Sequence, residues 1–76
     1  MEHGIKITYS WGDEESPVEC NSYEEAWEHA KELAIDEAEV ACDGWGSEVG
    51  IYFDVEENKI ILHYNYDDSY CYYKVF

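Results

Sequence analysis

The sequence predicts a two-layer α+β fold, an antiparallel sheet of four or five strands with one helix across one face. Stretches of alternating apolar and polar residues stand before and after one long segment of helical periodicity, and turn-forming residues separate them. The expected order is strand, strand, helix, strand, strand, strand. Because 76 residues are too few for two independent cores, we expect one acidic domain over residues 1–76.

The two opening strands form a predicted hairpin. The first is expected at residues 4–11, where Ile5, Ile7, Tyr9 and Trp11 alternate with polar residues. Residues 12–15 are typical of a turn. Residues 17–20 are expected to return as a short edge strand, where proline is tolerated.

The helix is predicted over residues 22–42. Ser22 and Glu25 have the spacing of a capping box, and Gly44 is placed to end the helix. One apolar arc, interrupted by the acid Glu37, is expected to pack on the sheet, and Trp27→Ala is expected to cost about 3–5 kcal/mol. The residues of this arc are Tyr23, Ala26, Trp27, Ala30, Leu33, Ala34, Ala38 and Ala41.

Three more strands are predicted at residues 49–55, 60–66 and 70–76, joined by turns at 56–59 and 67–69. We expect Val49, Ile51, Phe53 and Val55 to face the helix, with Ile51 and Phe53 sharing a core with Trp27 and Leu33. Tyr52 and His63 would then face away, with either Tyr70 and Tyr72 or Tyr64 and Tyr66. That wet face is either exposed through strand propensity alone or a binding or homodimer surface.

Charge excludes some functions. Four lysines, no arginine and 19 acids give a net charge of −15, which repels polyanions and excludes direct nucleic-acid binding, while 46% hydrophobic residues indicate a folded chain. Three widely spaced cysteines favour a reducing compartment, and no stretch resembles a signal or a membrane span. We therefore expect a cytoplasmic protein with no membrane association.

A second arc of the helix, about 120° wide, is acidic and lies opposite the alanine-rich arc. Acids at every fourth position stand about 6 Å apart along the axis, close to the phosphate spacing of a nucleic-acid strand, and like charges at that spacing destabilise a helix. Lys31 is the only cation between Ser22 and Cys42. The candidate partner-binding residues are Glu24, Glu25, Glu28, Glu32, Asp36 and Glu39, with Ile35 as an apolar centre.

The competing interpretation is that these acids serve solubility. Further acids flank the helix in sequence, namely Asp13, Glu14, Glu15, Glu19, Asp43 and Glu48.

No catalytic signature appears, so we expect no enzyme. The histidines and cysteines lack the short spacing of a zinc half-site, so we expect no metal and no cofactor, and Cys71 is expected to be a small buried hydrophobe. Trp11 and Trp45 are either anchors or lids of the core.

Size, charge and acid placement over the whole chain resemble the small acidic inhibitors of phages and mobile elements that mimic nucleic acid, including anti-restriction and anti-CRISPR proteins. No motif carries this resemblance, so it transfers no individual residue. It implies a non-enzymatic inhibitor whose partner is a basic nucleic-acid-binding protein, such as a defence nuclease or effector complex, in the host cytoplasm. The alternative is a small structural, oligomerisation or adaptor module that pairs through its Tyr-rich sheet face and open edges.

Overall fold

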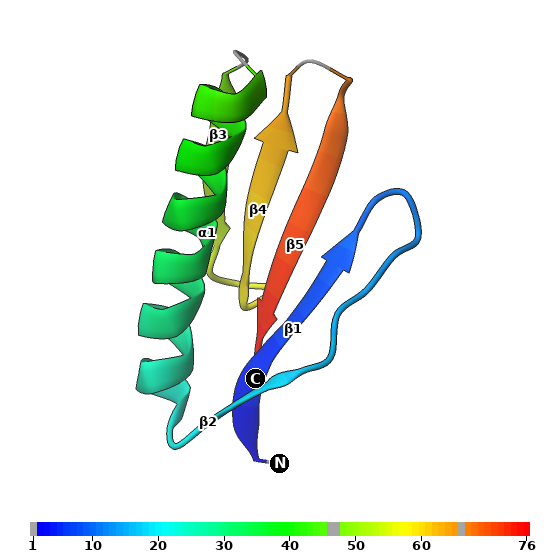
Figure 1. Ribbon diagram of the computed structural model, residues 1–76. Helices are drawn as coiled ribbons and strands as arrows, with labels where there is room; N and C mark the ends of the chain where they lie inside the picture. Colours follow the sequence, from blue (N-terminus) through cyan, green and yellow to red (C-terminus); the bar gives the residue numbers. More distant parts are fainter. Residues whose placement is uncertain (1, 46–47, 66) are drawn as a thin grey trace.

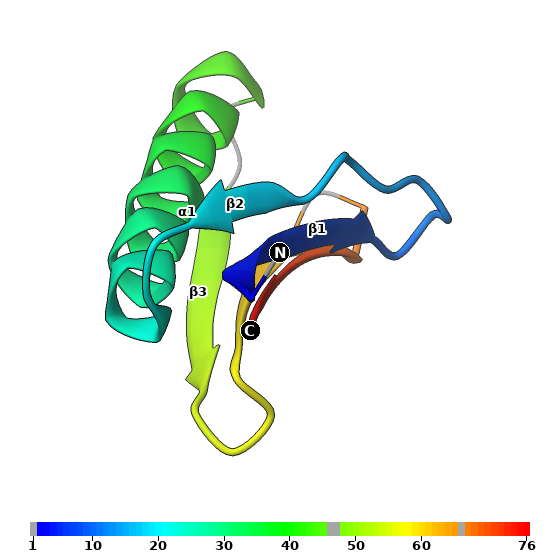
Figure 2. The ribbon, with the colours of Figure 1, turned by 90° about the horizontal axis from the view of Figure 1, so that it is seen from below.

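The computed structural model describes the backbone of residues 2–45, 48–65 and 67–76, and the side chains of these ranges except for residues 42–45. One helix lies across one face of a five-stranded antiparallel sheet, as predicted (Figures 1 and 2). In chain order the elements are β1 (His3–Tyr9), β2 (Val18–Cys20), α1 (Tyr23–Trp45), β3 (Val49–Asp54), β4 (Lys59–Tyr64) and β5 (Ser69–Val75).

The sheet order is β2-β1-β5-β4-β3, which places β5 at the centre and leaves β2 and β3 as edges. In the register of β1 with β5, Ile7 lies opposite Tyr73. Gly4 and Phe76 exchange two backbone hydrogen bonds, with N···O distances of 3.0 Å in both directions. At Gly4 a side chain would collide with the Val18 carbonyl, so glycine allows β2 to pair there. The first and last strands thus join the two hairpins into one sheet.

The start of α1 confirms the hydroxyl half of the predicted capping box, whereas the Glu25 carboxylate accepts from the amide of Asn21 and not from the expected amide of Ser22. The Glu25 amide donates to Ser22 Oγ at 3.1 Å, and Glu25 Oε2 accepts from the Asn21 amide at 2.8 Å. The predicted stop at Gly44 is wrong, because the helix continues through Gly44 to Trp45. A glycine inside a helix costs only about 1 kcal/mol relative to alanine, so it does not by itself end one.

The core lies between α1 and the three middle strands. The five alanines of the apolar helical arc are buried, which lets the helix approach the sheet closely. Ile5, Ile60 and Leu62 are fully buried beneath it, and Cys71 is the small buried hydrophobe that the sequence predicts. Tyr23, Trp27, Leu33 and Ile51 pack around this core half-buried.

Two residues expected in the core lie outside it. Phe53 and Val55 line a hollow with Trp27 and therefore lie on the helix side, but they are 53% and 70% exposed. The reason is the strand order, since β3 is an edge strand that α1 covers only in part. The first strand also ends earlier than predicted, at Tyr9, and Trp11 lies in the following turn, 53% exposed and stacked on the Tyr9 ring.

The register resolves which tyrosines face away from the helix. Tyr52, His63, Tyr70 and Tyr72 stand on the uncovered face, whereas Tyr64 is 5% exposed and lies under the helix. Tyr66 and the side chains of Asp43 and Trp45 lie outside the described part of the chain.

Candidate functional site: the acidic face of the helix

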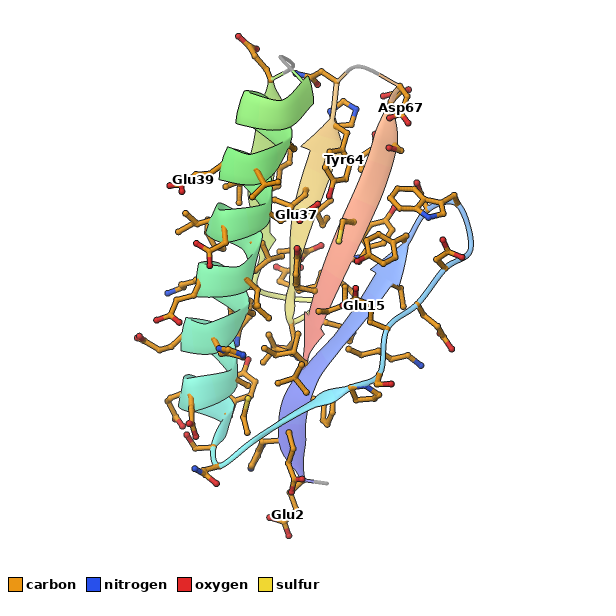
Figure 3. All side chains as sticks on the ribbon, viewed as in Figure 1. Glu2, Glu15, Glu37, Glu39, Tyr64 and Asp67 are labelled. Carbon is orange, nitrogen blue, oxygen red and sulfur yellow. The ribbon has the colours of Figure 1, made fainter. Side chains whose placement is uncertain are left out.

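All seven predicted partner-binding residues lie on α1 and are exposed (Glu24, Glu25, Glu28, Glu32, Ile35, Asp36 and Glu39). Burial of the alanine arc fixes the rotation of the helix about its axis, and the acidic arc opposite must therefore face solvent. Figure 3 shows Glu39 pointing away from the sheet while Glu37 lies on the sheet side. The periodicity therefore placed these side chains on one surface, which we call the acidic face.

The carboxylates of the acidic face have few partners. Glu25 is committed to the helix cap, and Glu32 Oε2 lies 4.0 Å from Nδ1 of His29, an exposed contact of little energy. Within the described side chains, no lysine forms an ion pair with this face. Three of the four lysines, Lys6, Lys59 and Lys74, lie instead on the far side of the sheet. These three lysines and the acidic face thus lie on opposite sides of the molecule.

Two of the flanking acids join the acidic face in space. Glu19 of β2 borders a hollow of about 290 Å³ with Glu25, Glu28 and Glu32. Glu15 borders another, of about 220 Å³, with Asp36 and Glu37.

Three other flanking acids, Asp13, Glu14 and Glu48, do not join the acidic face. Asp13 accepts from Trp11 Nε1 at 2.7 Å, and Glu14 lies 3.9 Å from Lys6 Nζ on the opposite side. Glu48 is exposed at the start of β3, beyond the far end of the helix. The acidic face therefore extends toward β2 and the loop before it, and not toward β3.

Apolar side chains also reach solvent beside the carboxylates. Ile35 is 47% exposed within the acidic face, in agreement with its having no core role. Sequence reasoning missed Val40, which is 63% exposed and lines the hollow that also contains Leu33. At 100° per residue around the helix axis, Val40 falls between the acidic and apolar arcs. This angular position is the sequence signal that could have identified Val40 as exposed beside the acidic face.

Glu37, the acid that interrupts the apolar arc, has a structural role. Its Oε1 accepts a hydrogen bond from the buried Tyr64 hydroxyl at 3.1 Å (Figure 3), and Tyr9 donates similarly to Glu15 at 3.0 Å. Burial, with smaller effects from the Cys71 thiol and the nearby carboxylates, raises the pKa of both tyrosines well above the ordinary value. These hydroxyls therefore stay protonated at neutral pH and act as donors.

The geometry gives no support to nucleophilic chemistry at Cys71. Burial raises the pKa of this thiol to about 11, so it is protonated at neutral pH and has no access to solvent. Among the described side chains, no group of three or more His, Cys, Asp or Glu gathers as a metal site would need.

Comparison with known protein families, with curated proteins and with solved structures finds no match to this chain. Along the described residues, no helix has the length and apolar character needed to cross a bilayer.

Proposed function

We propose that the acidic face of α1 occupies the basic nucleic-acid site of a nucleic-acid-binding protein, such as a host-defence nuclease or effector complex, and blocks it in the cytoplasm. The chain acts by occupancy and performs no chemistry. The observation that carries the proposal is the separation of charge, since exposed helical carboxylates lack lysine partners while three of the four lysines lie across the sheet.

Like charges at i and i+4 oppose helix formation, and lysines placed at i+4 would relieve them. Docking against arginine and lysine side chains would remove this repulsion. A chain of net charge −15 would also be drawn to a basic cleft, which speeds encounter by roughly 10- to 1,000-fold at low salt. Ile35 and Val40 add apolar area within and beside the contact.

The test is capture of a partner from the native host, followed by competition with nucleic acid. The variant Glu28→Lys/Glu32→Lys/Asp36→Lys reverses the centre of the acidic face. A matched control, Glu2→Lys/Glu48→Lys/Glu56→Lys, changes the net charge by the same amount at exposed acids away from the helix. We expect the helix variant to lose the partner and the control to keep it, and we expect nucleic acid to displace the wild-type protein.

Equal loss in both variants would show that overall charge matters and the helix face does not. Capture by a folded helix variant at wild-type strength, or a partner that nucleic acid cannot displace, would refute the proposal.

A second candidate function, pairing through an open sheet edge, is favoured by β3. This edge strand pairs with β4 over six consecutive residues without a bulge, and it contains no lysine or proline that would protect it. Tyr52 and Phe53 are each more than half exposed, and Val55 follows just after the strand. In this alternative the chain is a structural or adaptor module that adds β3 to a partner strand or to a second copy.

Salt separates the two candidates. Pairing of apolar strands should survive 0.5 M NaCl, whereas contact through the acidic face should weaken steeply as the screening length falls to about 4 Å. Sedimentation of the protein alone, with Phe53→Lys as the variant that disrupts the edge, reveals whether the partner is a second copy.

A further inference from the structure

The uncovered face of the sheet carries a row of lysines. Lys74 of the central strand β5 lies directly opposite Lys6 of β1 on one side and Lys59 of β4 on the other. Directly opposed like charges on one sheet face destabilise strand pairing. The remaining lysine, Lys31, is on the helix, so three of four cations in a chain with 19 acids stand in one cross-strand row.

Two of these three ammonium groups contact neutral groups. Lys74 Nζ donates to the Glu57 backbone carbonyl at 2.8 Å, and Lys59 Nζ lies 5.6 Å from the centre of the Tyr72 ring. Two carboxylates flank the row. Glu14 lies 3.9 Å from Lys6 Nζ, and both side chains of that pair are more than half exposed, so the pair contributes little. Asp54 of β3 lies opposite Lys59 in the register, but its Oδ1 accepts a hydrogen bond from the Glu57 amide.

Flat rings continue the face beside the lysines. Tyr72 and Tyr70 are nearly parallel, with an interplanar angle of 9° and 6.1 Å between ring centres. His63 stacks on Tyr70 with 4.7 Å between ring centres. All three rings are half-buried, so they are held in place but still present surface to solvent.

The row borders a hollow of about 390 Å³ lined by Lys6, Thr8, Lys59, Tyr72 and Lys74. The acidic face of α1 is on the other side of the sheet, about 10 Å away or more at the usual spacing of packed layers, which exceeds the screening length of about 8 Å at physiological salt. An anion at the lysine row is therefore shielded from most of the helical carboxylates.

We propose that this hollow binds a phosphate-bearing compound with a flat ring, of the size and chemistry of a mononucleotide. The phosphate oxygens accept hydrogen bonds from the lysines and from the Thr8 hydroxyl, and the ring of the ligand stacks on the neighbouring tyrosine rings, Tyr72 and Tyr70. The volume lies within the range of small-molecule sites. This site is separate from the acidic face, and the proposal does not depend on the function assigned to that face.

The test is an NMR titration of the isotope-labelled protein with AMP, with inorganic phosphate and with a ten-residue single-stranded DNA. We expect AMP to shift backbone amides of β1, β4 and β5 around the row, and phosphate alone to bind at least tenfold more weakly. Lys59→Gln/Lys74→Gln should weaken AMP binding by about tenfold or more, and Lys74→Gln alone should weaken it less, whereas Lys31→Gln, which removes the same single charge on the helix, should leave it unchanged. Tyr72→Leu should weaken AMP but not phosphate.

Tighter binding of AMP than of the oligonucleotide would assign the site to free nucleotides. We expect this result, because a chain of net charge −15 repels a polyanion more strongly than a small anion. Preference for the oligonucleotide assigns the same chemistry to single-stranded nucleic acid. No shift with any ligand would overturn the proposal, as would shifts that the lysine variant does not reduce. Equal binding of AMP and phosphate, unaffected by Tyr72→Leu, would overturn the role of the rings.

Discussion

Replacing Glu28 by lysine is expected to stabilise the protein although it alters the proposed binding surface. Glu28 is exposed and stands at i+4 from Glu24 and at i−4 from Glu32, so it takes part in two like-charge pairs on one helix face. Lysine at this position would convert both repulsions into attractions. Three residues away on either side, the new lysine would attract Glu25 and repel Lys31, where Glu28 repels Glu25 and attracts Lys31. These two changes have opposite signs and cancel to first order.

The four changes at i±4 comprise two repulsions removed and two attractions gained, each a few tenths of a kcal/mol. They sum to about 1 kcal/mol at low ionic strength. For a domain of this size, that free energy corresponds to a rise in Tm of roughly 4–8 °C. At 1 M NaCl the screening length is about 3 Å, shorter than the spacing of about 6 Å between successive carboxylates, so most of the gain should disappear.

Thermal unfolding followed by circular dichroism at 20 mM and 1 M NaCl measures both effects. Glu56→Lys, an exposed site in the turn after β3, makes the same change in net charge without helical neighbours and serves as the control. A gain in Tm that survives 1 M NaCl, or one that Glu56→Lys reproduces, would refute the argument that local repulsion on the acidic face opposes folding. If the gain is as expected, the carboxylates are present at the expense of stability, as residues retained for binding commonly are.

Other predictions concern the core and its hydrogen bonds. Leu62→Ala, at a fully buried position on β4, should lower the free energy of unfolding in urea by about 3 kcal/mol, and a loss below 1 kcal/mol would contradict the packing described. Tyr64→Phe should cost about 1 kcal/mol, and a double-mutant cycle with Glu37→Ala, which removes the acceptor, should show coupling; additive effects would mean that the bond contributes nothing. Because burial raises the pKa of the Cys71 thiol from 9.0 to about 11, its contribution to stability is complete below pH 9 and is lost as the pH rises to about 11, so the urea midpoint should fall over that range. Cys71→Ala should reduce the fall between pH 9 and 10, before the buried tyrosines, whose pKa is raised from 10.0, add to it; an identical fall there would assign it to other groups.

Local sequence signals predicted most of the fold. The capping box at Ser22 and Glu25 located the start of α1, and strict alternation located β1, β3 and β4, since both depend only on neighbouring residues. The exposure of Phe53 was not predictable in this way. It follows from the position of β3 at an edge, which depends on the pairing of β1 with β5 across the length of the chain.

Local sequence signals predict the acidic face of α1 but not the lysine row on the uncovered face of the sheet. The acidic face follows from helical periodicity alone, so its seven residues were identified correctly as neighbours on one exposed surface. The lysine row requires the register of three strands, and residues as far apart as Lys6 and Lys74 give no local sign that they are opposite each other. The choice between Tyr70 with Tyr72 and Tyr64 with Tyr66 was open for the same reason.

The pairing of β1 with β5 also determines when the molecule can become compact during synthesis. The hairpin of β3 and β4 can close locally, but β1 has no partner in the middle of the sheet until β5 has been made. Until then Ile5 and Ile7 have no central strand to pack beside, and α1 has only part of the sheet beneath it. A nascent chain is therefore expected to remain sensitive to proteolysis until β5 emerges and then to gain protection in one cooperative step.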